Sequence, residues 1–485
     1  MAPATSASVS PPVLEPFIRS LDVAAQKNYR DDPNYYAKYS RSLITKSTVN
    51  SFMTGTGDAI YRSLAPLLET TNHELILVTC FWARSSSLET LNKVLRNLSH
   101  KAICRGTERI RVRLCFSSSS LLQKLFHKQS AEGQIYDQSS WTKQFGLPDP
   151  SELGGLDLQI KSIFILPFSV MHPKFIIIDR QTVVLPSCNI SWEEWFEGAI
   201  TCTGPIVGQF TKFYEEYWLR QTPPDLPATT QEDSKPWHAN IAETSDLGHA
   251  NIVTHFSSTT KSSTISAIPT VFLPSPHRRN PRFQPFASTE LVTAPPTPLN
   301  SFVLTLLSKA EKSIRIQSPN VTSPPVLSAI LAALQRGIDV SILTSSRLMI
   351  LEQLVTAGTT TSRCINTLIK RYKKLVPCGP TYDEETAIAM PRLGRLRVSY
   401  FEPNGGVKKR GQEGSEPQQS HLKMMIADSE VVVLGSGNLD RASWFTSQEL
   451  GVAFFDKGFV GQVESMVDQA MEGRSKLRYD SEAWA

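Results

Sequence analysis

The same short phrase occurs twice in this chain, and it constrains the fold more than any other feature of the sequence. Both copies read His-x-Lys-x-x-x-x-Asp: the first comprises His172, Lys174 and Asp179, and the second comprises His421, Lys423 and Asp428. Each copy leads into an apolar run that is typical of a β-strand. Because the copies are far apart in a chain of 485 residues, the repeat predicts two structurally equivalent halves.

The similarity between the two copies continues downstream of the motif aspartates. A tetrapeptide with Ser second and Asn fourth follows each aspartate, at 186–189 (PSCN) and at 435–438 (GSGN), and a glutamate comes later in each copy, Glu197 and Glu449. Chance alone would place Lys and Asp at these spacings after some histidine in only roughly 0.02 positions. Two matching copies therefore indicate an internal duplication.

The order of the expected helices and strands also repeats. Apolar spacing predicts helix–strand–helix–strand at 59–69, 74–81, 88–98 and 109–116 in the first half, and at 302–307, 313–319, 326–334 and 339–345 in the second. A further strand is expected before each motif. Such alternation is typical of mixed sheets covered by helices. We therefore expect an α/β fold with two tandem pseudo-symmetric α/β/α halves and the active site at their interface.

Local composition divides the chain further. The segment 222–301 is rich in Pro, Ser and Thr, which is typical of a linker or surface excursion. We expect an N-terminal extension at 1–50, a first half at 51–222, a linker at 223–269 and a second half at 270–485 with an insertion near 347–395. Since one chain carries both copies of the motif, a monomer suffices to build the expected site.

Overall composition narrows the class of protein. A content of 40% hydrophobic and 20% charged residues is that of a folded protein, and a net charge of +5 is too small to indicate nucleic-acid binding by itself. Seven cysteines without a Cys-x-x-Cys pair indicate free thiols in a reducing compartment. No signal peptide or membrane span is recognisable. The expected location is cytoplasmic, with peripheral membrane contact.

The expected insertion contains a helix with a basic face. Within the segment 363–376, the apolar residues Ile365, Leu368 and Ile369 fall on one side, and the basic residues Lys370, Arg371, Lys373 and Lys374 lie nearby. Such a helix is either a solvated surface helix or a helix that lies on a membrane surface or guides phosphate. The sequence leaves both interpretations open.

The paired motifs resemble those of the phospholipase D superfamily. The second copy matches the family pattern at His421, Lys423, Asp428, Gly435, Ser436, Asn438 and Glu449. The first copy has Pro186 where the family has Gly, and this change is expected to reshape the turn beside the phosphate. The resemblance implies phosphodiester chemistry in a pocket between two phospholipase D-like halves.

Residues outside the two motifs indicate which branch of the superfamily the chain resembles. After Asn438, the chain keeps Asp440 and Ser443 of the pattern seen in cardiolipin synthase-like members, but Ala442 and Ser447 replace its Arg and Asn. The motif aspartates argue against the related tyrosyl-DNA phosphodiesterases, which lack them. A member of the phospholipase D or cardiolipin synthase-like branch is therefore expected.

Cleaving a phosphodiester requires positive charge, a nucleophile and an acid. Lys174 and Lys423 supply the charge, and the two histidines supply the nucleophile and the acid. By analogy with the family, His172 is the expected nucleophile, which becomes a covalent phospho-histidine, and His421 is the expected acid and base.

Supporting roles are expected for the other repeated residues. Asn189, Asn438, Ser187 and Ser436 are predicted to bind the phosphate, with the serines bracing its loops. Glu197 and Glu449 are expected to orient the imidazoles, although the sequence does not show which glutamate serves which histidine. Asp179 and Asp428 have the character of structural residues. Neither a metal nor another cofactor is expected, because no ligand cluster with metal-site spacing is present.

Three functions remain open at this stage. The first is hydrolysis or transphosphatidylation of phospholipid head groups, with a phospholipid as the partner molecule. The second is a nuclease of the same superfamily, for which the sequence shows only local basic clusters. The third is a phosphate-binding interaction protein that has lost turnover, an interpretation motivated by Pro186.

Overall fold

The protein is described by a computed structural model. It covers residues 11–484 apart from 107, 120–126, 128–129, 166–168, 221–253, 258–264, 277–292, 347, 349, 377–391 and 409–415. Most of the predicted linker and part of the predicted insertion lie outside the described residues.

Apart from β6 and β7, which form a separate two-stranded sheet, the described strands form one large mixed sheet. In the first half these are β1 (Ile44–Gly55), β2 (Glu74–Phe81), β3 (Ile110–Ser118), β4 (Gln134–Tyr136), β5 (Leu156–Ser162), β8 (Phe175–Ile178), β9 (Thr182–Pro186) and β10 (Trp195–Thr203). In the second half they are β12 (Ile265–Ser275), β13 (Ser313–Gln317), β14 (Asp339–Thr344), β15 (Leu396–Phe401), β17 (Met424–Ala427), β18 (Val431–Gly435), β19 (Glu449–Phe455) and β20 (Ser475–Asp480). Shorter strands are β6 (Phe164–Ile165), β7 (Ser169–Val170), β11 (Thr254–Ser257) and β16 (Gln419–Ser420).

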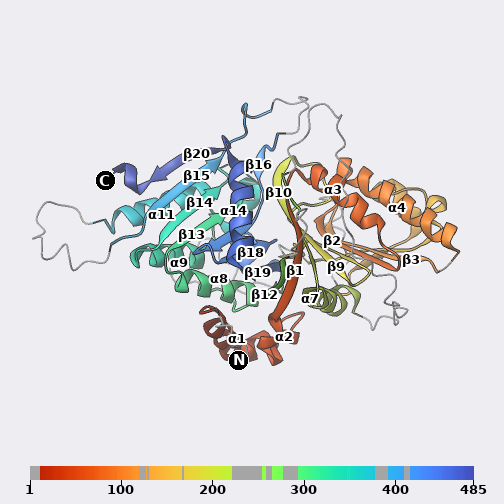
Figure 1. Cartoon of the computed structure of the whole chain (residues 1–485), viewed down its shortest axis with the longest axis horizontal. Helices are drawn as coiled ribbons and strands as arrows, with labels where there is room; N and C mark the ends of the chain where they lie inside the picture. Colours follow the sequence, from red (N-terminus) through yellow and green to blue (C-terminus); the bar gives the residue numbers. More distant parts are fainter. Residues whose placement is uncertain are drawn as a thin grey trace, which may run out of the picture.

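Counted outward from their junction, the first seven strands follow the same order in both halves, whereas the outermost strand differs, because β4 precedes β5 in the chain and β20 follows β19. The first half runs β1-β10-β9-β8-β2-β3-β5-β4, and the second runs β12-β19-β18-β17-β13-β14-β15-β20. Strands β1 and β12 pair antiparallel and join the halves, which lie side by side in Figure 1. The expected pair of pseudo-symmetric halves with mixed sheets is confirmed.

Helices cover the sheet in both halves. The first half has α3 (Gly57–Glu69), α4 (Ser86–Arg105), α6 (Gln138–Phe145) and α7 (Ile206–Phe213). The second has α8 (Pro298–Lys309), α9 (Pro324–Gln335), α10 (Ile350–Ala357), α11 (Thr361–Lys373), α13 (Arg441–Phe445) and α14 (Lys457–Met471). Short helical turns occupy Ser40–Leu43, Pro150–Leu153, Tyr214–Leu219 and Ser481–Trp484. The repeated helix–strand–helix–strand order predicted from the apolar spacing is therefore confirmed.

Local sequence signals set where these helices begin and end. At α4, the Ser85 hydroxyl accepts a hydrogen bond from the Leu88 amide at 3.2 Å, and the helix stops at Gly106 with φ +64°. A serine N-cap and a left-handed glycine after the last turn are the favoured ends of a helix. The leucines between them pack against β2 and β3 in the core of the first half.

The region before the first repeat is part of the folded core. It holds α1 (Leu14–Asn28) and α2 (Tyr35–Lys38), and α1 lies beneath the second half in Figure 1. The Phe17 ring is fully buried and meets the Phe302 ring of α8 edge-on at 5.2 Å. Burying such a ring stabilises the fold by roughly 1.5–3 kcal/mol, so α1 is an anchor between the N-terminus and the second half.

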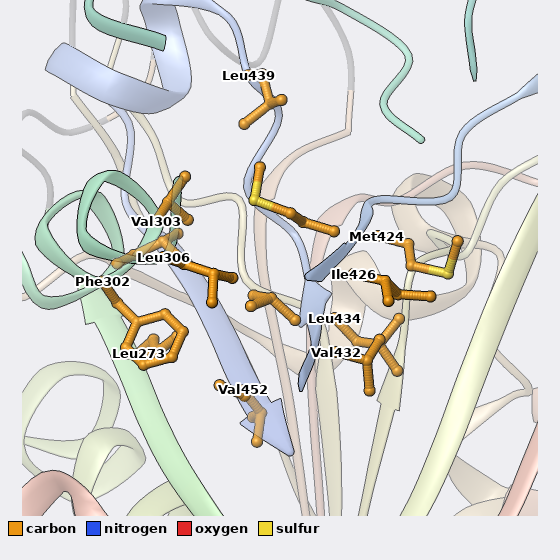
Figure 2. Close-up of a cluster of buried hydrophobic side chains, with 14 of the residues drawn as sticks. Leu273, Phe302, Val303, Leu306, Met424, Ile426, Val432, Leu434, Leu439 and Val452 are labelled. Atoms are coloured by element: carbon orange, nitrogen blue, oxygen red, sulfur yellow. The ribbon is translucent and has the colours of Figure 1, made fainter. Parts of the chain in front are cut away.

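Figure 2 shows the core beneath the second motif. Val303 and Leu306 of α8 lie against Leu434 of β18 and Val452 of β19, and Met424 of β17 lies close by. Each of these side chains is less than 5% exposed. The strand that follows the second motif is therefore fixed by packing, which restricts where His421 and Lys423 can lie.

The two motif aspartates make the same contacts in both halves. The Asp179 carboxylate accepts hydrogen bonds from the backbone amides of residues 72–74 at 2.7–2.8 Å. The Asp428 carboxylate accepts from those of residues 311–313 at 2.7–3.0 Å. Both aspartates have positive φ, 48° and 56°, a conformation that Asp tolerates better than most residues. Each aspartate thus ties its hairpin turn to the start of the neighbouring strand.

This arrangement predicts that Asp179→Ala destabilises the fold. Removing an ionised acceptor of three amide hydrogen bonds should lower the free energy of unfolding by about 3 kcal/mol. Urea unfolding monitored by circular dichroism measures the change. Asp157→Ala is the matched control, because the Asp157 carboxylate is 56% exposed and pairs with Arg113, so its loss should change stability by about 1 kcal/mol at most. Equal effects of the two substitutions would contradict the structural role of Asp179.

Candidate active site

Backbone hydrogen bonds between the halves place both motif histidines at the junction. The His172 amide donates to the Gln448 carbonyl at 3.0 Å, and the His421 amide donates to the Phe196 carbonyl at 2.8 Å. The second contact extends the parallel pairing of β10 with β16. Each motif therefore begins at a contact with the other half. The contacted residues, Gln448 and Phe196, immediately precede Glu449 and Glu197.

Each histidine is bound by the glutamate of the opposite half. His172 Nδ1 lies 2.8 Å from the nearer Glu449 carboxylate oxygen, and His421 Nδ1 lies 2.7 Å from Glu197 Oε1. Both glutamates are buried. An Nδ1–H that donates to a carboxylate leaves the Nε2 lone pair available for attack or proton transfer. The pairing left open by the sequence is thus reciprocal between the halves.

The two motif serines support these glutamates. The Ser187 hydroxyl donates to Glu197 Oε2, and the Ser436 hydroxyl donates to Glu449 Oε2 at 2.5 Å. Ser443 adds a second hydroxyl to Glu449, at 2.6 Å from Oε1. These hydroxyl hydrogens are directed at carboxylates, so the geometry gives Ser187 and Ser436 a glutamate-orienting role in place of the phosphate contacts predicted for them.

The turn that contains Pro186 keeps the hydrogen bonds of the equivalent turn in the second half. The Ser187 amide donates to the Gly198 carbonyl at 2.8 Å, and the equivalent Ser436 amide donates to the Leu450 carbonyl at 2.9 Å. In each turn the serine Oγ also accepts from the opposing amide, at 2.9 Å in the first half and 3.0 Å in the second. The hydrogen bonds of the serine are therefore the same in both turns, but the backbone before it differs, because proline fixes φ at about −65° whereas Gly435 has φ +158°. The expected effect of Pro186 on the turn beside the phosphate stays a prediction.

The motif lysines are buried beneath the histidines. Lys174 Nζ donates to the His172 carbonyl at 2.9 Å, and Lys423 Nζ donates to the His421 carbonyl at 2.7 Å. Lys423 also lines an apolar cavity beside Met424 and Trp444. Burial lowers the pKa of Lys423 to about 7, even though Glu197 opposes the shift. An anion bound nearby would favour its charged form.

Burial also lowers the pKa of both histidines. The pKa of His421 falls to about 3 and that of His172 falls below its usual value, in each case because desolvation outweighs the attraction of the paired glutamate. Both imidazoles are therefore neutral near pH 7 in the empty site. A bound phosphodiester anion would stabilise a proton on one of them, so substrate binding and protonation of the acid are coupled.

The two asparagines predicted to bind phosphate differ in their contacts. Asn189 Oδ1 accepts a hydrogen bond from the Phe81 amide at 3.2 Å, which directs the carbonyl of the side chain toward β2. Asn438 Nδ2 donates to Asp440 Oδ2 at 3.1 Å, and Asn438 lines the pocket that contains both histidines. A direct phosphate contact by either asparagine stays a prediction.

Both histidines line one pocket. Its other lining residues all come from the second half: Asn320, Thr322, Leu348, Gln353, Thr356, Asn438, Asp440 and Ala442. Most of this wall is polar, and Asn320, Thr322 and Gln353 are also buried. The two histidines are therefore arranged symmetrically, whereas the polar wall of the pocket comes from the second half alone.

The sequence did not reveal several residues around this site. Trp195 packs its ring 4.6 Å from the His421 ring, and Gln353 reaches the pocket from the predicted insertion. Neither belongs to the repeated pattern, so no spacing signal could have identified them.

Of the part of the chain that the structure describes, no group of three or more His, Cys, Asp or Glu side chains is arranged to hold a metal ion. Among the same residues, no helix has the length and apolar character needed to cross a bilayer.

Comparisons with known proteins were made for sequence and for structure. A family model described as "Cardiolipin synthase, PLD-like domain" matches residues 303–471. No curated protein sequence matches the chain. Among solved structures, the phosphatidylserine synthase of Haemophilus influenzae Rd KW20 is similar over 95% of this chain and 92% of that chain, with a TM-score of 0.53 and 13% identity. Nuc, a phospholipase D family member from Salmonella typhimurium, matches over 37% of this chain and 91% of that chain, with 19% identity and a TM-score of 0.25.

The similarity to the synthase extends over both halves and shows the fold. The family model covers the second motif with Lys423 and Glu449, and the first motif is related to the second by the shared strand order and by the matching contacts of Asp179 and Asp428. Residues 303–471 thus match the phospholipase D-like domain of the family model, and the chain as a whole shares the fold of the synthase.

Proposed function

We propose that this protein is a phospholipase D-type phosphodiesterase and phosphatidyltransferase that acts on phospholipid head groups. The observation that carries the proposal is that His172 and His421, each bound by a buried glutamate of the other half, line one pocket. The family relationship and the fold shared with a phosphatidylserine synthase support the same chemistry. The expected cytoplasmic location remains a prediction.

The proposed reaction has two steps. In the first, His172 Nε2 attacks phosphorus, the bond to the leaving oxygen breaks, and His421 gives its proton to that oxygen. In the second, His421 accepts a proton from water or an alcohol, whose oxygen attacks phosphorus and displaces His172. Water completes a hydrolysis and an alcohol completes a transfer. Lys174 and Lys423 stabilise the charge on the non-bridging oxygens.

The pocket wall favours a head group over a nucleobase. Side-chain amides and hydroxyls of Asn320, Thr322 and Thr356 line it, and such groups suit the hydroxyls or amine of a phospholipid head group. Recognition of single-stranded nucleic acid usually uses aromatic side chains on which bases stack. Among the lining residues of this pocket, the two histidines carry the only rings, so the geometry gives the nuclease alternative no specific support.

A substrate panel tests the proposal. Wild-type protein is expected to release head groups from phospholipid vesicles, to form a new phospholipid when an alcohol is added, and to retain its activity with EDTA. His172→Ala should abolish every one of these activities. Turnover of single-stranded DNA or RNA without turnover of any phospholipid would replace the proposal with the nuclease. No turnover of either class would favour the phosphate-binding protein, whose motivation is weakened because Ser187 keeps the hydrogen bonds of the equivalent Ser436.

The pKa of Lys423 predicts the alkaline limb of the pH profile. Because this lysine loses its positive charge as pH rises through about 7, it should add a further fall of about tenfold in kcat/KM for each pH unit above that value, beyond the fall caused by loss of the His421 proton. Bound substrate raises the pKa of Lys423, so kcat should persist to higher pH than kcat/KM does. Steady-state kinetics on a soluble phosphodiester would show this separation. A kcat/KM whose pH dependence does not steepen between pH 7 and 9 would contradict a Lys423 pKa of about 7 in the free protein.

A further inference from the structure

Helix α10 forms one wall of the active-site pocket. Gln353 and Thr356 of this helix line the pocket, as does Leu348 just before it. The Gln353 side chain is buried and fixed at both ends, because it donates to Asn320 Oδ1 at 2.8 Å and accepts from the Thr361 amide at 2.6 Å. The pocket-facing side of α10 is therefore held firmly against the site.

The remaining side of α10 exposes a cluster of large apolar side chains. Ile350, Leu351, Leu354 and Val355 are all exposed, and Leu351 is 80% exposed. Other exposed apolar residues of the described chain, such as Val23 on α1, do not occur four to a short helix. Scattered apolar residues are normal on a protein surface, whereas a contiguous group beside a pocket marks an interaction site.

The helix that follows α10 adds positive charge. Its buried stripe includes Ile365 and Leu368, and its exposed residues include the cations Arg363, Lys370, Arg371, Lys373 and Lys374. Between positions 350 and 376, Glu352 is the single acidic residue in the sequence. A surface that combines exposed apolar side chains with a basic helix is complementary to the anionic face of a phospholipid bilayer.

We propose that α10 and the exposed face of α11 form a docking surface for anionic phospholipid bilayers, with the apolar side chains of α10 entering the lipid interface at the pocket mouth. This inference rests on the proposed function, since it explains how an insoluble substrate reaches the histidines. Docking through α10 brings lipid head groups to the helix that supplies Gln353 and Thr356 to the pocket. It also selects the membrane-surface interpretation of the basic insertion helix.

Vesicle co-sedimentation of the full chain tests the apolar part of this surface. Leu351→Asp should weaken binding to vesicles that contain phosphatidylglycerol by at least about tenfold, and Leu351→Trp should strengthen it. Val23→Asp is the matched control, because Val23 is 84% exposed and lies on α1, and it should bind as wild type does. All three variants should turn over a soluble phosphodiester at the wild-type rate.

The charge part is tested in the same assay. Lys370→Glu combined with Lys374→Glu should reduce the preference for anionic over neutral vesicles by about tenfold or more, and Lys93→Glu on α4 should not. Equal vesicle affinities of Leu351→Asp and Val23→Asp would overturn the proposal. A change of oligomeric state in Leu351→Asp without lipid would also overturn it, because the face would then pack against another copy of the chain.

Two further outcomes separate the docking surface from the proposed function. Vesicle binding that depends on Leu351, without turnover of any phospholipid, would support the docking surface and reject the proposed substrate. Phospholipid turnover that is insensitive to Leu351→Asp and Leu351→Trp would reject the docking surface and support the substrate. If Leu351→Asp also impaired turnover of the soluble diester, the Leu351→Trp variant would decide, since only a docking role predicts tighter binding.

Discussion

His172→Ala is expected to lower phosphodiester turnover by about 10⁴-fold or more, because removing a nucleophile removes the covalent route altogether. The informative comparison is with His421→Ala on a diester whose leaving group is p-nitrophenolate, which departs without needing a proton. His421→Ala should release one equivalent of p-nitrophenol per chain rapidly and then stall, because no base remains to activate water. His172→Ala should show no such burst.

Both substitutions remove a partly buried ring, so folding has to be checked. Unfolding midpoints within a few degrees of wild type would show that the loss of activity arises from the chemistry. A burst in His172→Ala, with none in His421→Ala, would mean that the nucleophile and the acid are exchanged between the halves. A burst in neither variant would argue against a covalent intermediate.

The second large effect concerns the reciprocal glutamates. Glu449→Gln should slow turnover by about 10²- to 10⁴-fold, because a glutamine no longer fixes the tautomer of His172 or stabilises charge on it. Since Glu449 acts through His172, adding Glu449→Gln to His172→Ala should cause almost no further loss of residual activity. The same substitution should be much more harmful in the His421→Ala background, where His172 still reacts.

The opposite half supplies the matched test of this pairing. Glu197→Gln should mainly slow the second step, because Glu197 holds His421, and the covalent intermediate should accumulate in single-turnover experiments. Glu194→Gln is a suitable control, since Glu194 is a half-exposed acid on the same segment that pairs with Lys408. Accumulation of the intermediate in Glu449→Gln, and not in Glu197→Gln, would contradict the pairing between halves.

Most of the predictions about the fold came from the internal repeat in the sequence. Apolar spacing is local information, so it located β2 and α4 and showed that both halves share one element order. The structural character of Asp179 and Asp428 followed from their place at the strand ends. Where β1 begins and how α1 packs on Phe302 depend on contacts between distant segments, and local patterns do not encode such contacts.

The sequence predicted which residues belong to the candidate site, but it did not predict which of them contact one another. The pairing of His421 with Glu197 depends on β10 lying parallel to β16, which is a tertiary feature without a sequence signature. Likewise, the motif pattern locates Ser187 and Ser436 but does not show that their hydroxyls point at glutamates. Gln353 lies outside the repeat altogether, because the polar wall of the pocket belongs to one half alone.

The central claim is that two histidines from different halves act on one phosphorus atom. The most direct measurement is mass-spectrometric mapping of the adduct formed when His421→Ala is mixed with the p-nitrophenyl diester and quenched during the burst. The account predicts a phosphoryl adduct on His172, in a yield of about one per chain, that is absent from the His172→Ala, His421→Ala double variant. An adduct on another residue, or a burst without any adduct on His172, would contradict it.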